Sequence, residues 1–233
     1  MVTYTAGKLW GKAFIKGSKI RKAWKGGKLL YQAAAVSLVN MIPNGSFETD
    51  TSGWTISITS GNGSFTRVAL PAANSNITYT PNAYCLQSST TSFNGALATI
   101  TINPALTVVS GNKYYIRFYY RNATKGTTAI VIGNNNATAL TAIASSGTFN
   151  NTGLNGTGVW TLCDGIWQAN TTSLTLRFNF TTANGNNSKD MCIDNVVVLN
   201  LTSIFGSGVE PAYATCRNMF SSLGGYFDGT VLY

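Results

Sequence analysis

The sequence predicts an all-β protein: an antiparallel β-sandwich with a basic N-terminal arm and a short C-terminal helix. Charged residues make up only 10% of the 233 residues, whereas Asn, Thr, Ser and Gly are abundant. This composition is typical of many short strands joined by polar turns. Residues 113–121 and 174–180 both alternate between apolar and other residues. Such alternation indicates antiparallel strands with one face on a core, rather than the continuous apolar runs of a parallel sheet.

The positive charge of the chain is concentrated at its N-terminus. Residues 1–32 hold seven Lys, one Arg and no acid, so they carry +8 of the formal net charge of +9. The remaining residues hold eight basic and seven acidic side chains and are nearly neutral. Nucleic-acid binding would therefore depend on this arm alone. Because the arm has no known nucleic-acid-binding fold, a nucleic-acid partner is not expected.

Residues 1–32 form the predicted basic arm, which contains two short hairpins. Gly17-Ser18 and Gly26-Gly27 each separate two runs with apolar residues, and such pairs are hairpin turn signals. An isolated hairpin is marginally stable in water, so we expect the arm to order by joining a partner's sheet or by packing on its own sandwich. The alternative is a solvated basic tail. Four large aromatic residues oppose that alternative and are assigned to assembly: Trp10, Phe14, Trp24 and Tyr31.

After the arm, the sequence predicts a linker at residues 33–39, a sandwich at 40–200 and a loop–helix segment at 201–233. Further strands are expected at residues 54–58, 64–69, 97–102, 128–132 and 193–199. In the last segment we expect a loop at 203–208 and a helix that begins at Pro211 and ends at Gly224-Gly225. No run of about 18 apolar residues predicts a membrane span, and no signal peptide is expected.

Two motifs bracket the predicted sandwich. Residues 40–54, NMIPNGSFETDTSGW, place a turn before Phe47-Glu48 and a polar loop before Trp54, and residues 193–196 are Ile-Asp-Asn-Val. Both motifs resemble those that open and close the jelly-roll β-sandwiches of carbohydrate-binding modules. The resemblance implies a jelly roll in which Glu48 and Asp194 help hold a structural Ca²⁺ between the first and last strands. The alternative is that both acids are surface residues at turns.

Two other segments resemble phage proteins. The arm repeats a pattern, x-K-G-x-K followed by Ile or Leu, that is similar to the start of phage tail and other virion proteins. Residues 201–233 contain LTSIFGSGVEP and GYFDGT, which resemble a segment that follows sandwich domains in phage tail and related structural proteins. These resemblances imply a virion location, other virion proteins as partners and assembly as a homo-oligomer.

The residue inventory argues against catalysis. The chain has no His, which excludes a Ser-His-Asp triad or a Cys-His pair. It has only seven acids, and those in the motifs have structural explanations, so a pair of carboxylates for glycoside hydrolysis is not favoured. We therefore expect that the protein is not an enzyme.

Four cysteines are present: Cys85, Cys163, Cys192 and Cys216. They show no C-x-x-C spacing and no His accompanies them, so a zinc site is not expected. Buried thiols are the expectation because cysteine is often a small core residue. A Cys163–Cys192 bridge is the alternative that the sequence leaves open.

Polar and aromatic residues alternate with the apolar face of the two clearest strands. The set is Tyr115, Arg117, Tyr119, Arg177 and Asn179. Exposed aromatic rings and hydrogen-bonding groups on one sheet face are suited to a glycan. The alternative, which we favour, is that the arm, the C-terminal helix or a neighbouring subunit covers this face.

Together these observations predict a non-enzymatic structural protein of a bacteriophage virion: a tail, baseplate, fibre or head-decoration component. Its roles would be particle assembly and contact with a glycan of the host surface. The alternative is a carbohydrate-binding module of a secreted bacterial protein, a class usually joined to a catalytic domain.

Overall fold

The structure is a computed structural model, and it divides into two units, Met1–Val36 and Ser37–Tyr233. The division falls inside the predicted linker at residues 33–39. The described residues are 14–15, 18–19, 22–25, 28–32, 36–58, 64–69, 83–88, 97–122, 129–134, 138–145, 160–181, 191–223 and 226–233.

The first unit contains the two predicted hairpins. Strand β1 (Phe14–Ile15) pairs with β2 (Ser18–Lys19), and β3 (Lys22–Lys25) pairs with β4 (Lys28–Gln32), both antiparallel. Each pair is a two-stranded sheet of its own. The assembly role of Trp10, Phe14, Trp24 and Tyr31 lies outside what the structure describes, because Trp10 is not among the described residues and the other three are described by backbone only.

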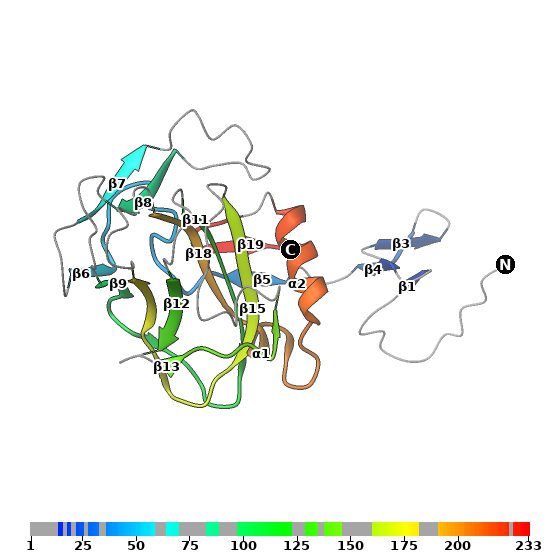
Figure 1. Ribbon diagram of the computed structural model, residues 1–233. Helices are drawn as coiled ribbons and strands as arrows, with labels where there is room; N and C mark the ends of the chain where they lie inside the picture. The colour runs from blue at the N-terminus through cyan, green and yellow to red at the C-terminus, as the bar shows by residue number, and fades with distance from the viewer. Residues whose placement is uncertain are drawn as a thin grey trace. The chain divides into compact units, whose positions relative to one another are not determined.

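The second unit is built on two antiparallel sheets (Figure 1). The six-stranded sheet has the order β14-β15-β11-β18-β8-β7, with the bounds Ala144–Ser145, Thr161–Gln168, Lys113–Asn122, Met191–Asn200, Tyr84–Ser88 and Phe65–Ala69. The five-stranded sheet has the order β13-β12-β17-β9-β6, with the bounds Thr138–Ala139, Ala129–Asn134, Leu176–Thr181, Leu97–Ile102 and Trp54–Ile58. Because the chain crosses repeatedly between the sheets, the predicted jelly-roll sandwich is confirmed.

Two short ribbons complete the unit. Strand β10 (Leu106–Thr107) pairs with β16 (Ser173–Leu174), and β19 (Thr230–Leu232) pairs with β5 (Ser37–Val39). Strand β5 occupies the end of the predicted linker, so residues 37–39 belong to the sandwich unit. The pairing of β5 with β19 brings the start of this unit beside its end.

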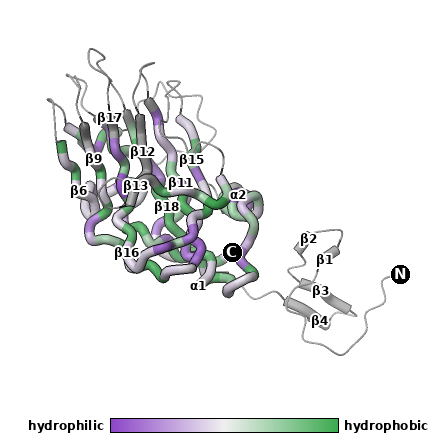
Figure 2. The backbone as a smooth tube through the Cα atoms, turned by 60° about the horizontal axis from the view of Figure 1, so that its bottom comes forward, coloured by the Kyte–Doolittle hydropathy of each residue, from purple (hydrophilic) through white to green (hydrophobic). Residues whose placement is uncertain are grey.

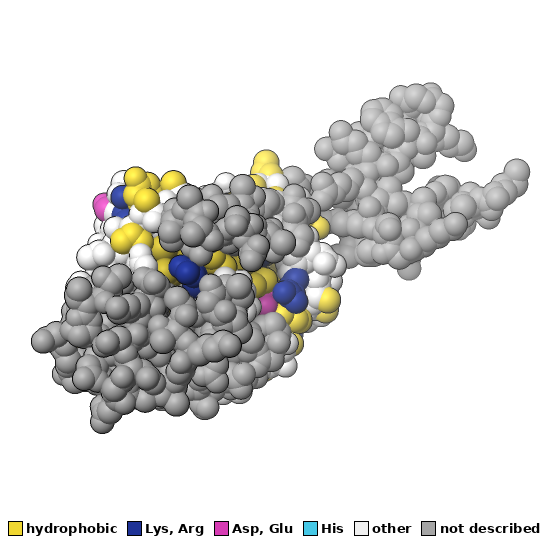
Figure 3. Space-filling view, turned by 45° about the horizontal axis from the view of Figure 1, so that its top comes forward, with side chains coloured by type: hydrophobic (Ala, Val, Ile, Leu, Met, Phe, Trp, Pro, Cys, Tyr) yellow, Lys and Arg dark blue, Asp and Glu magenta, His cyan; other side chains and the backbone are white. Residues whose placement is uncertain are grey.

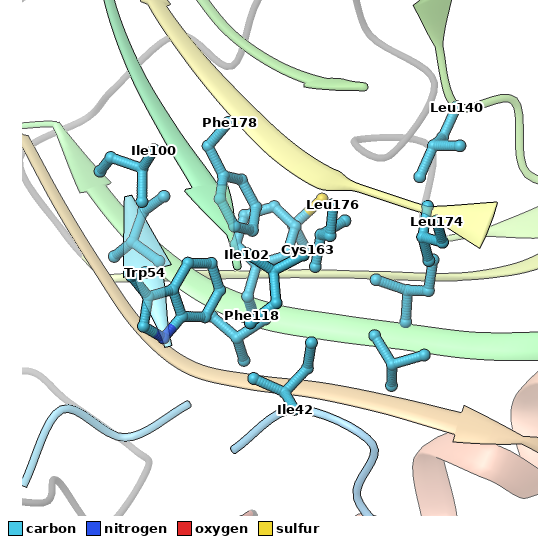
Figure 4. Close-up of a cluster of buried hydrophobic side chains, with 14 of the residues drawn as sticks. Ile42, Trp54, Ile100, Ile102, Phe118, Leu140, Cys163, Leu174, Leu176 and Phe178 are labelled. Atoms are coloured by element: carbon cyan, nitrogen blue, oxygen red, sulfur yellow. The ribbon is translucent and has the colours of Figure 1, made fainter. Parts of the chain in front are cut away.

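The first core lies between the two sheets. Hydrophobic and hydrophilic residues are interspersed along most described strands (Figure 2), and strands such as β17 turn one face inward. Phe178 of β17 contacts Phe118 of β11 across the interior, with ring centroids 4.8 Å apart, and Trp54 lies 6.2 Å from Phe178 (Figure 4). Ile100 and Leu176 are also fully buried in this cluster. The alternation seen in the sequence is therefore the pattern of sheet-to-sheet packing.

A second core lies on the outer face of the six-stranded sheet. It joins sheet residues to the two helices, α1 (Leu201–Phe205) and α2 (Tyr213–Ser222). Its buried members are Tyr115, Ile166, Val197, Leu199, Leu201, Cys216, Met219 and Phe220. The predicted C-terminal helix therefore packs on the sandwich. The prediction of a loop at 203–208 is wrong for residues 203–205, which belong to α1, while residues 206–208 are not helical. The Asn200 side chain caps α1 by accepting a hydrogen bond from the Ser203 N–H at 2.9 Å.

A bulge in β18 lets one strand serve both cores. Asn195 has φ +54°, and the pairing register between β11 and β18 shifts between Arg117 and Tyr119. Ile193 and Val196 both belong to the first core, so the alternation slips by one residue between them. Beyond the bulge, Val197 lies in the second core. The bulge therefore sets which side chains meet the C-terminal helix.

The opening segment, residues 40–47, lies directly against β18. The Asn40 side chain accepts hydrogen bonds from the N–H groups of Ile42 and Val198 and donates to the Val196 carbonyl, at 3.0–3.3 Å. The Gly45 carbonyl accepts from the Val196 N–H at 2.9 Å. A Cβ on Gly45 would lie 2.1 Å from the Val196 carbonyl oxygen, so only glycine permits this approach. The opening and closing motifs are thus joined through backbone and amide groups.

All four cysteines are buried and none is in a disulfide. Cys163 belongs to the first core and Cys216 to the second. The alternative of a Cys163–Cys192 bridge is therefore not observed. Burial raises the pKa of the Cys216 thiol to about 12, with a further contribution from the nearby Asp164 charge.

Candidate functional site

The outer face of the six-stranded sheet carries Tyr115, Arg117 and Tyr119, and helix α2 covers part of it. The ring of Tyr115 lies 5.5 Å from that of Phe220, centroid to centroid, and both residues are fully buried. The Arg117 guanidinium lies 4.5 Å from the Phe220 ring centroid and donates a hydrogen bond to the Tyr119 hydroxyl at 3.1 Å. Arg117 is 4% exposed. Tyr115 and Arg117 are therefore inaccessible to a large ligand while α2 is in place.

Asp164 of β15 is the polar centre of this covered face. Its carboxylate accepts hydrogen bonds from the hydroxyls of Tyr115 at 2.7 Å and Tyr213 at 2.8 Å. The Arg217 guanidinium of α2 approaches the same carboxylate at 3.1 Å, although Asp164 itself is 0% exposed. Burial, followed by the Asp164 charge, raises the pKa of the Tyr115 hydroxyl well above its usual range. Asp164 therefore attaches α2 to the sheet. Both oxygens of its carboxylate are already engaged by these protein groups.

Arg177 and Asn179 lie on a different surface. They belong to β17, where they alternate with the core residues Leu176 and Phe178. They therefore lie on the outer face of the five-stranded sheet. The expectation that Tyr115, Arg117, Tyr119, Arg177 and Asn179 share one face is wrong, because strands β11 and β17 belong to opposite sheets.

The outer face of the five-stranded sheet carries a hydrogen-bonded polar cluster. The Arg177 Nε donates to the Asn179 amide oxygen at 2.5 Å, and Arg177 Nη2 donates to the Thr99 hydroxyl at 3.0 Å. The Thr99 hydroxyl in turn donates to the Asn179 amide oxygen at 3.4 Å. These contacts join the Arg177 and Asn179 side chains of β17 to the Thr99 side chain of the neighbouring strand β9. Arg177 and Asn179 are both half-buried, and they cover Thr99, which is 6% exposed.

Strand pairing extends this cluster into two polar rows. One row runs from Arg177 through Thr101 to Thr55, and the other from Asn179 through Thr99 to Ser57. Neighbouring positions are about 4.8 Å apart across the strands and about 6.8 Å apart along them. Thr55 and Ser57 are exposed. The rows form a grid of hydroxyl, amide and guanidinium groups, which we call the polar face.

Glu48 and Asp194 make separate contacts in the structure. The Glu48 carboxylate accepts a hydrogen bond from the Tyr84 N–H at 2.9 Å, at the start of β8. Asp194 is fully buried and accepts from the Asn195 N–H at 2.7 Å. Among the described residues, no group of three or more His, Cys, Asp or Glu side chains is arranged to hold a metal ion. Calcium binding by Glu48 and Asp194 stays a prediction.

Arg67 holds the backbone around Glu48 in place. Its guanidinium donates to the Phe47 carbonyl at 2.6 Å and also to the Glu48 carbonyl. The same group lies 3.3 Å from the centroid of the Tyr84 ring. The opening motif is therefore attached to the β7–β8 edge of the sheet as well as to β18.

The C-terminal motif also has structural roles. Glu210 accepts hydrogen bonds from the Thr202 hydroxyl at 2.9 Å and the Lys113 ammonium at 3.3 Å. These contacts and the residue's own N–H hold the pKa of the Glu210 carboxyl below its usual range, the N–H contributing most. Asp228 accepts from the hydroxyls of Ser46, at 3.0 Å, and Tyr226. The acids of this motif therefore lock the C-terminal segment to the sandwich.

The described charges leave no broad basic surface on the face drawn in Figure 3. There the Lys and Arg side chains of the described residues stand apart, with hydrophobic and neutral groups between them. This agrees with the near-neutral charge of the chain beyond the arm. Neither helix in the described part of the chain is long and apolar enough to cross a membrane.

Sequence reasoning missed two features of these surfaces. Asp164 stands in the otherwise uncharged run TLCDGIWQ, and an acid in a buried strand is a signal that a specific partner exists. Thr99 and Thr101 alternate with Ile100 and Ile102, so their face could have been assigned to the outside. The polar face depends on the pairing of β9 with β17. The sequence of neither strand predicts that the two are neighbours.

Comparison with known proteins gives structural similarities only. No protein-family model matches the chain, and no curated protein matches it. One similar solved structure is the enzymatically active domain of tailspike protein 4 of bacteriophage CBA120: 16% identity, 69% of this chain, 21% of that chain and a TM-score of 0.47. The chain therefore spans about a fifth of that tailspike chain.

Two other similar structures are carbohydrate-binding modules. TmCBM61, solved with β-1,4-galactotriose, has 15% identity, coverage of 69% of this chain and 98% of that chain, and a TM-score of 0.47. The xylan-binding domain from CBM 22 has 15% identity, coverage of 70% and 94%, and a TM-score of 0.40. At these identities and TM-scores the similarities assign no function to this chain.

The contacts of Asp164 predict its effect on stability. Asp164→Ala would leave the buried Tyr115 hydroxyl without its acceptor, whereas the 45% exposed Arg217 can be rehydrated, and should lower the free energy of unfolding by roughly 2–3 kcal/mol. Tyr213→Phe removes a single hydrogen bond to the same carboxylate and should cost about 1 kcal/mol. Urea unfolding of both variants measures the difference. Equal midpoints for the two variants would contradict the central role of Asp164.

Proposed function

We propose that this protein is a non-enzymatic structural component of a bacteriophage virion whose sandwich contacts a glycan through the polar face. The observation that carries the glycan contact is the Arg177–Asn179–Thr99 cluster on the five-stranded sheet. Hydroxyl-rich ligands are recognised by preorganised hydrogen-bonding groups, and the internal contacts of this cluster hold an amide and a guanidinium in place on a rigid sheet. Both described helices pack in the second core, on the other sheet.

The polar face also indicates the kind of contact. Its two rows offer hydroxyl, amide and guanidinium groups and no aromatic ring. Binding would therefore depend on hydrogen bonds rather than on stacking against a sugar ring. Contacts of this kind are individually weak, about 1 kcal/mol net for each hydrogen bond, and repeated copies in a particle would add avidity. A weak contact of this kind is useful in a protein that is present in many copies, as a virion component is.

The proposal assigns assembly to the arm. The arm is a unit distinct from the sandwich, and its two hairpins are separate two-stranded sheets. Two-stranded sheets are marginal alone, and a chain segment with +8 charge and four aromatic residues gains most from a partner surface. Other virion proteins and further copies of this chain are the proposed partners.

The alternative function is a carbohydrate-binding module of a secreted bacterial protein. In both proposals the polar face binds a glycan. They differ in the role of the arm, which would not join a particle if the protein were such a module. Immunogold electron microscopy with antibody to the sandwich distinguishes the two, because only the virion protein would label intact phage particles.

The polar face is tested by its own substitutions. The double variant Arg177→Ala, Asn179→Ala should lose at least about tenfold in affinity for a glycan that the wild type binds, which is about 1.4 kcal/mol. The exposed Asn170→Ala is the matched control and should bind as the wild type does. A glycan array followed by titration calorimetry gives both affinities. Undiminished binding by the double variant, or release of reducing ends by the wild type, would refute this part of the proposal.

The arm is tested by deletion of residues 1–36. Since the second unit contains both cores, the truncated protein should keep the cooperative melting of the sandwich. It should fail to enter particles when it replaces the full-length chain. Particle incorporation is measured by immunoblotting of purified phage. If the truncated protein is incorporated normally, the arm is not the assembly element.

A further inference from the structure

Arg177 is the only charged residue in the strands that the structure assigns to the five-stranded sheet. These strands read TA, AIVIGN, LRFNFT, LATITI and WTISI. The acids among the described residues belong to the opening motif, the six-stranded sheet and the C-terminal segment: Glu48, Asp50, Asp164, Asp194, Glu210 and Asp228. Within the described part of the chain, the hydrogen-bond partners of the Arg177 guanidinium are neutral. The polar face therefore carries one positive charge that no described acid balances.

The oxygen acceptors of the Arg177–Asn179–Thr99 cluster are engaged within the cluster. Asn179 Oδ1 accepts from Arg177 Nε at 2.5 Å and from the Thr99 hydroxyl at 3.4 Å. The Thr99 hydroxyl accepts from Arg177 Nη2 at 3.0 Å. Because the two acceptor oxygens are 3.4 Å apart, both bonds from Arg177 leave the same edge of the guanidinium, the edge formed by Nε and Nη2. This edge is therefore used to position the side chain.

The polar groups that remain for a ligand are N–H donors. A guanidinium has a second edge, formed by Nη1 and Nη2, that can bind two acceptors at once. Among the described residues, no hydrogen bond uses Arg177 Nη1 or Asn179 Nδ2. Both side chains are half-buried, whereas the Thr99 beneath them is 6% exposed. On β12 the position opposite Arg177 is Gly133, which adds no side chain to this row.

We propose that the ligand of the polar face is an acidic glycan whose carboxylate accepts hydrogen bonds from the Nη1–Nη2 edge of Arg177 and from Asn179 Nδ2. This inference rests on the proposed glycan contact and specifies the class of its ligand. An ionised carboxylate is an acceptor-only group, and its two oxygens match the planar edge of a guanidinium. The hydroxyl of a neutral sugar presents one oxygen and no charge to the same donors.

The rest of the row suits the neutral part of such a ligand. From Arg177 the row continues through Thr101 to Thr55, and Thr55 is exposed. Threonine hydroxyls both donate and accept, as sugar hydroxyls do. Since neighbouring strands are about 4.8 Å apart, the backbone at Thr55 is about 10 Å from that at Arg177. The carboxylate-bearing sugar would therefore lie over β17, and adjoining sugars would extend across β9 and β6.

The experiment uses the full chain and pairs of glycans. An array presents oligosaccharides of glucuronate and galacturonate beside their carboxyl-reduced forms, which contain glucose and galactose. For the pairs that are bound, titration calorimetry should give at least about tenfold tighter binding to the acidic member, since hydrogen bonds to charged groups are stronger than neutral ones. At roughly 1 M salt this preference should shrink, because half-exposed charges are screened.

Two variants test the donors directly. Asn179→Asp exchanges the Nδ2 donor for an acceptor oxygen and keeps an oxygen for the contacts with Arg177 and Thr99, so the native melting transition should remain. Its new carboxylate would neutralise Arg177 and repel an acidic ligand. Arg177→Gln removes the charge and the fork of donors. In both variants the ratio of acidic to neutral affinity should fall to about one.

A third variant controls for the basic arm, which also carries positive charge. Lys25→Gln changes the net charge as much as Arg177→Gln does, but on β3 of the arm, and it should keep the preference of the wild type. A variant that had unfolded would lose both affinities and its melting transition, so loss of fold is told apart from loss of preference.

The outcomes separate this inference from the proposed function. Equal binding of acidic and neutral members by the wild type would overturn the inference and leave the proposed glycan contact in place. An equal loss of preference in Lys25→Gln and Arg177→Gln, or an undiminished preference in Asn179→Asp, would also overturn it. Failure of the wild type to bind any glycan of the array would refute the glycan contact itself, and this inference with it.

Discussion

The close approach of the opening segment to β18 is the contact on which the rest of the sandwich depends. The Gly45 carbonyl accepts the Val196 N–H at 2.9 Å, and the position of its α-carbon leaves no room for a side chain. Asn40 completes the contact, because one side-chain amide serves both Val196 and Val198 while its backbone N–H donates to the Gly229 carbonyl at 2.8 Å. Opening motif, closing strand and C-terminal segment therefore meet at one place.

This convergence explains why three separated motifs occur in one chain. Ser46 of the opening motif donates to Asp228 of the C-terminal motif, and the Asn40 amide also donates to the Phe227 carbonyl at 3.4 Å. Phe227 stacks on Phe220 of α2, with ring centroids 5.5 Å apart. The segment after the sandwich is thus part of its packing and not an appendage. The bulge at Asn195 supports this arrangement by directing Val197 and Leu199 toward the helix.

The same arrangement determines which surface is available for binding. With α2 and the C-terminal tail on the six-stranded sheet, the buried polar residues there serve structure: Asp164 binds Arg217 and two tyrosine hydroxyls. The five-stranded sheet keeps Arg177, Asn179 and their threonine neighbours on its outer face. We therefore propose that the six-stranded sheet binds the C-terminal segment, while the five-stranded sheet presents the polar face to a ligand.

Much of the fold could be predicted from periodicity, and the candidate site could not. Alternation with a period of two identifies β11 and β17 because each has one face on the first core. It does not say which sheet a strand joins, so Arg117 and Arg177 appear equivalent in the sequence although they lie on opposite sheets. The N-cap role of Asn200 could not be predicted from the sequence. Asn200 is the last residue of β18 and α1 begins at the next residue, so no loop marks the start of the helix. The close approach at Gly45 depends on a partner about 150 residues away, which no local pattern encodes.

The most direct test of the central contact is equilibrium unfolding of Gly45→Ala beside Gly111→Ala. A Cβ at Gly111 meets nothing within 4 Å, and the cost of this variant comes only from its φ of +88°, about 1 kcal/mol. At Gly45 the added methyl must push the backbone away from Val196 and break the hydrogen bond between them, which should cost about 3 kcal/mol. We therefore predict the larger loss of stability for Gly45→Ala. Equal stability of the two variants would contradict the central role of this contact.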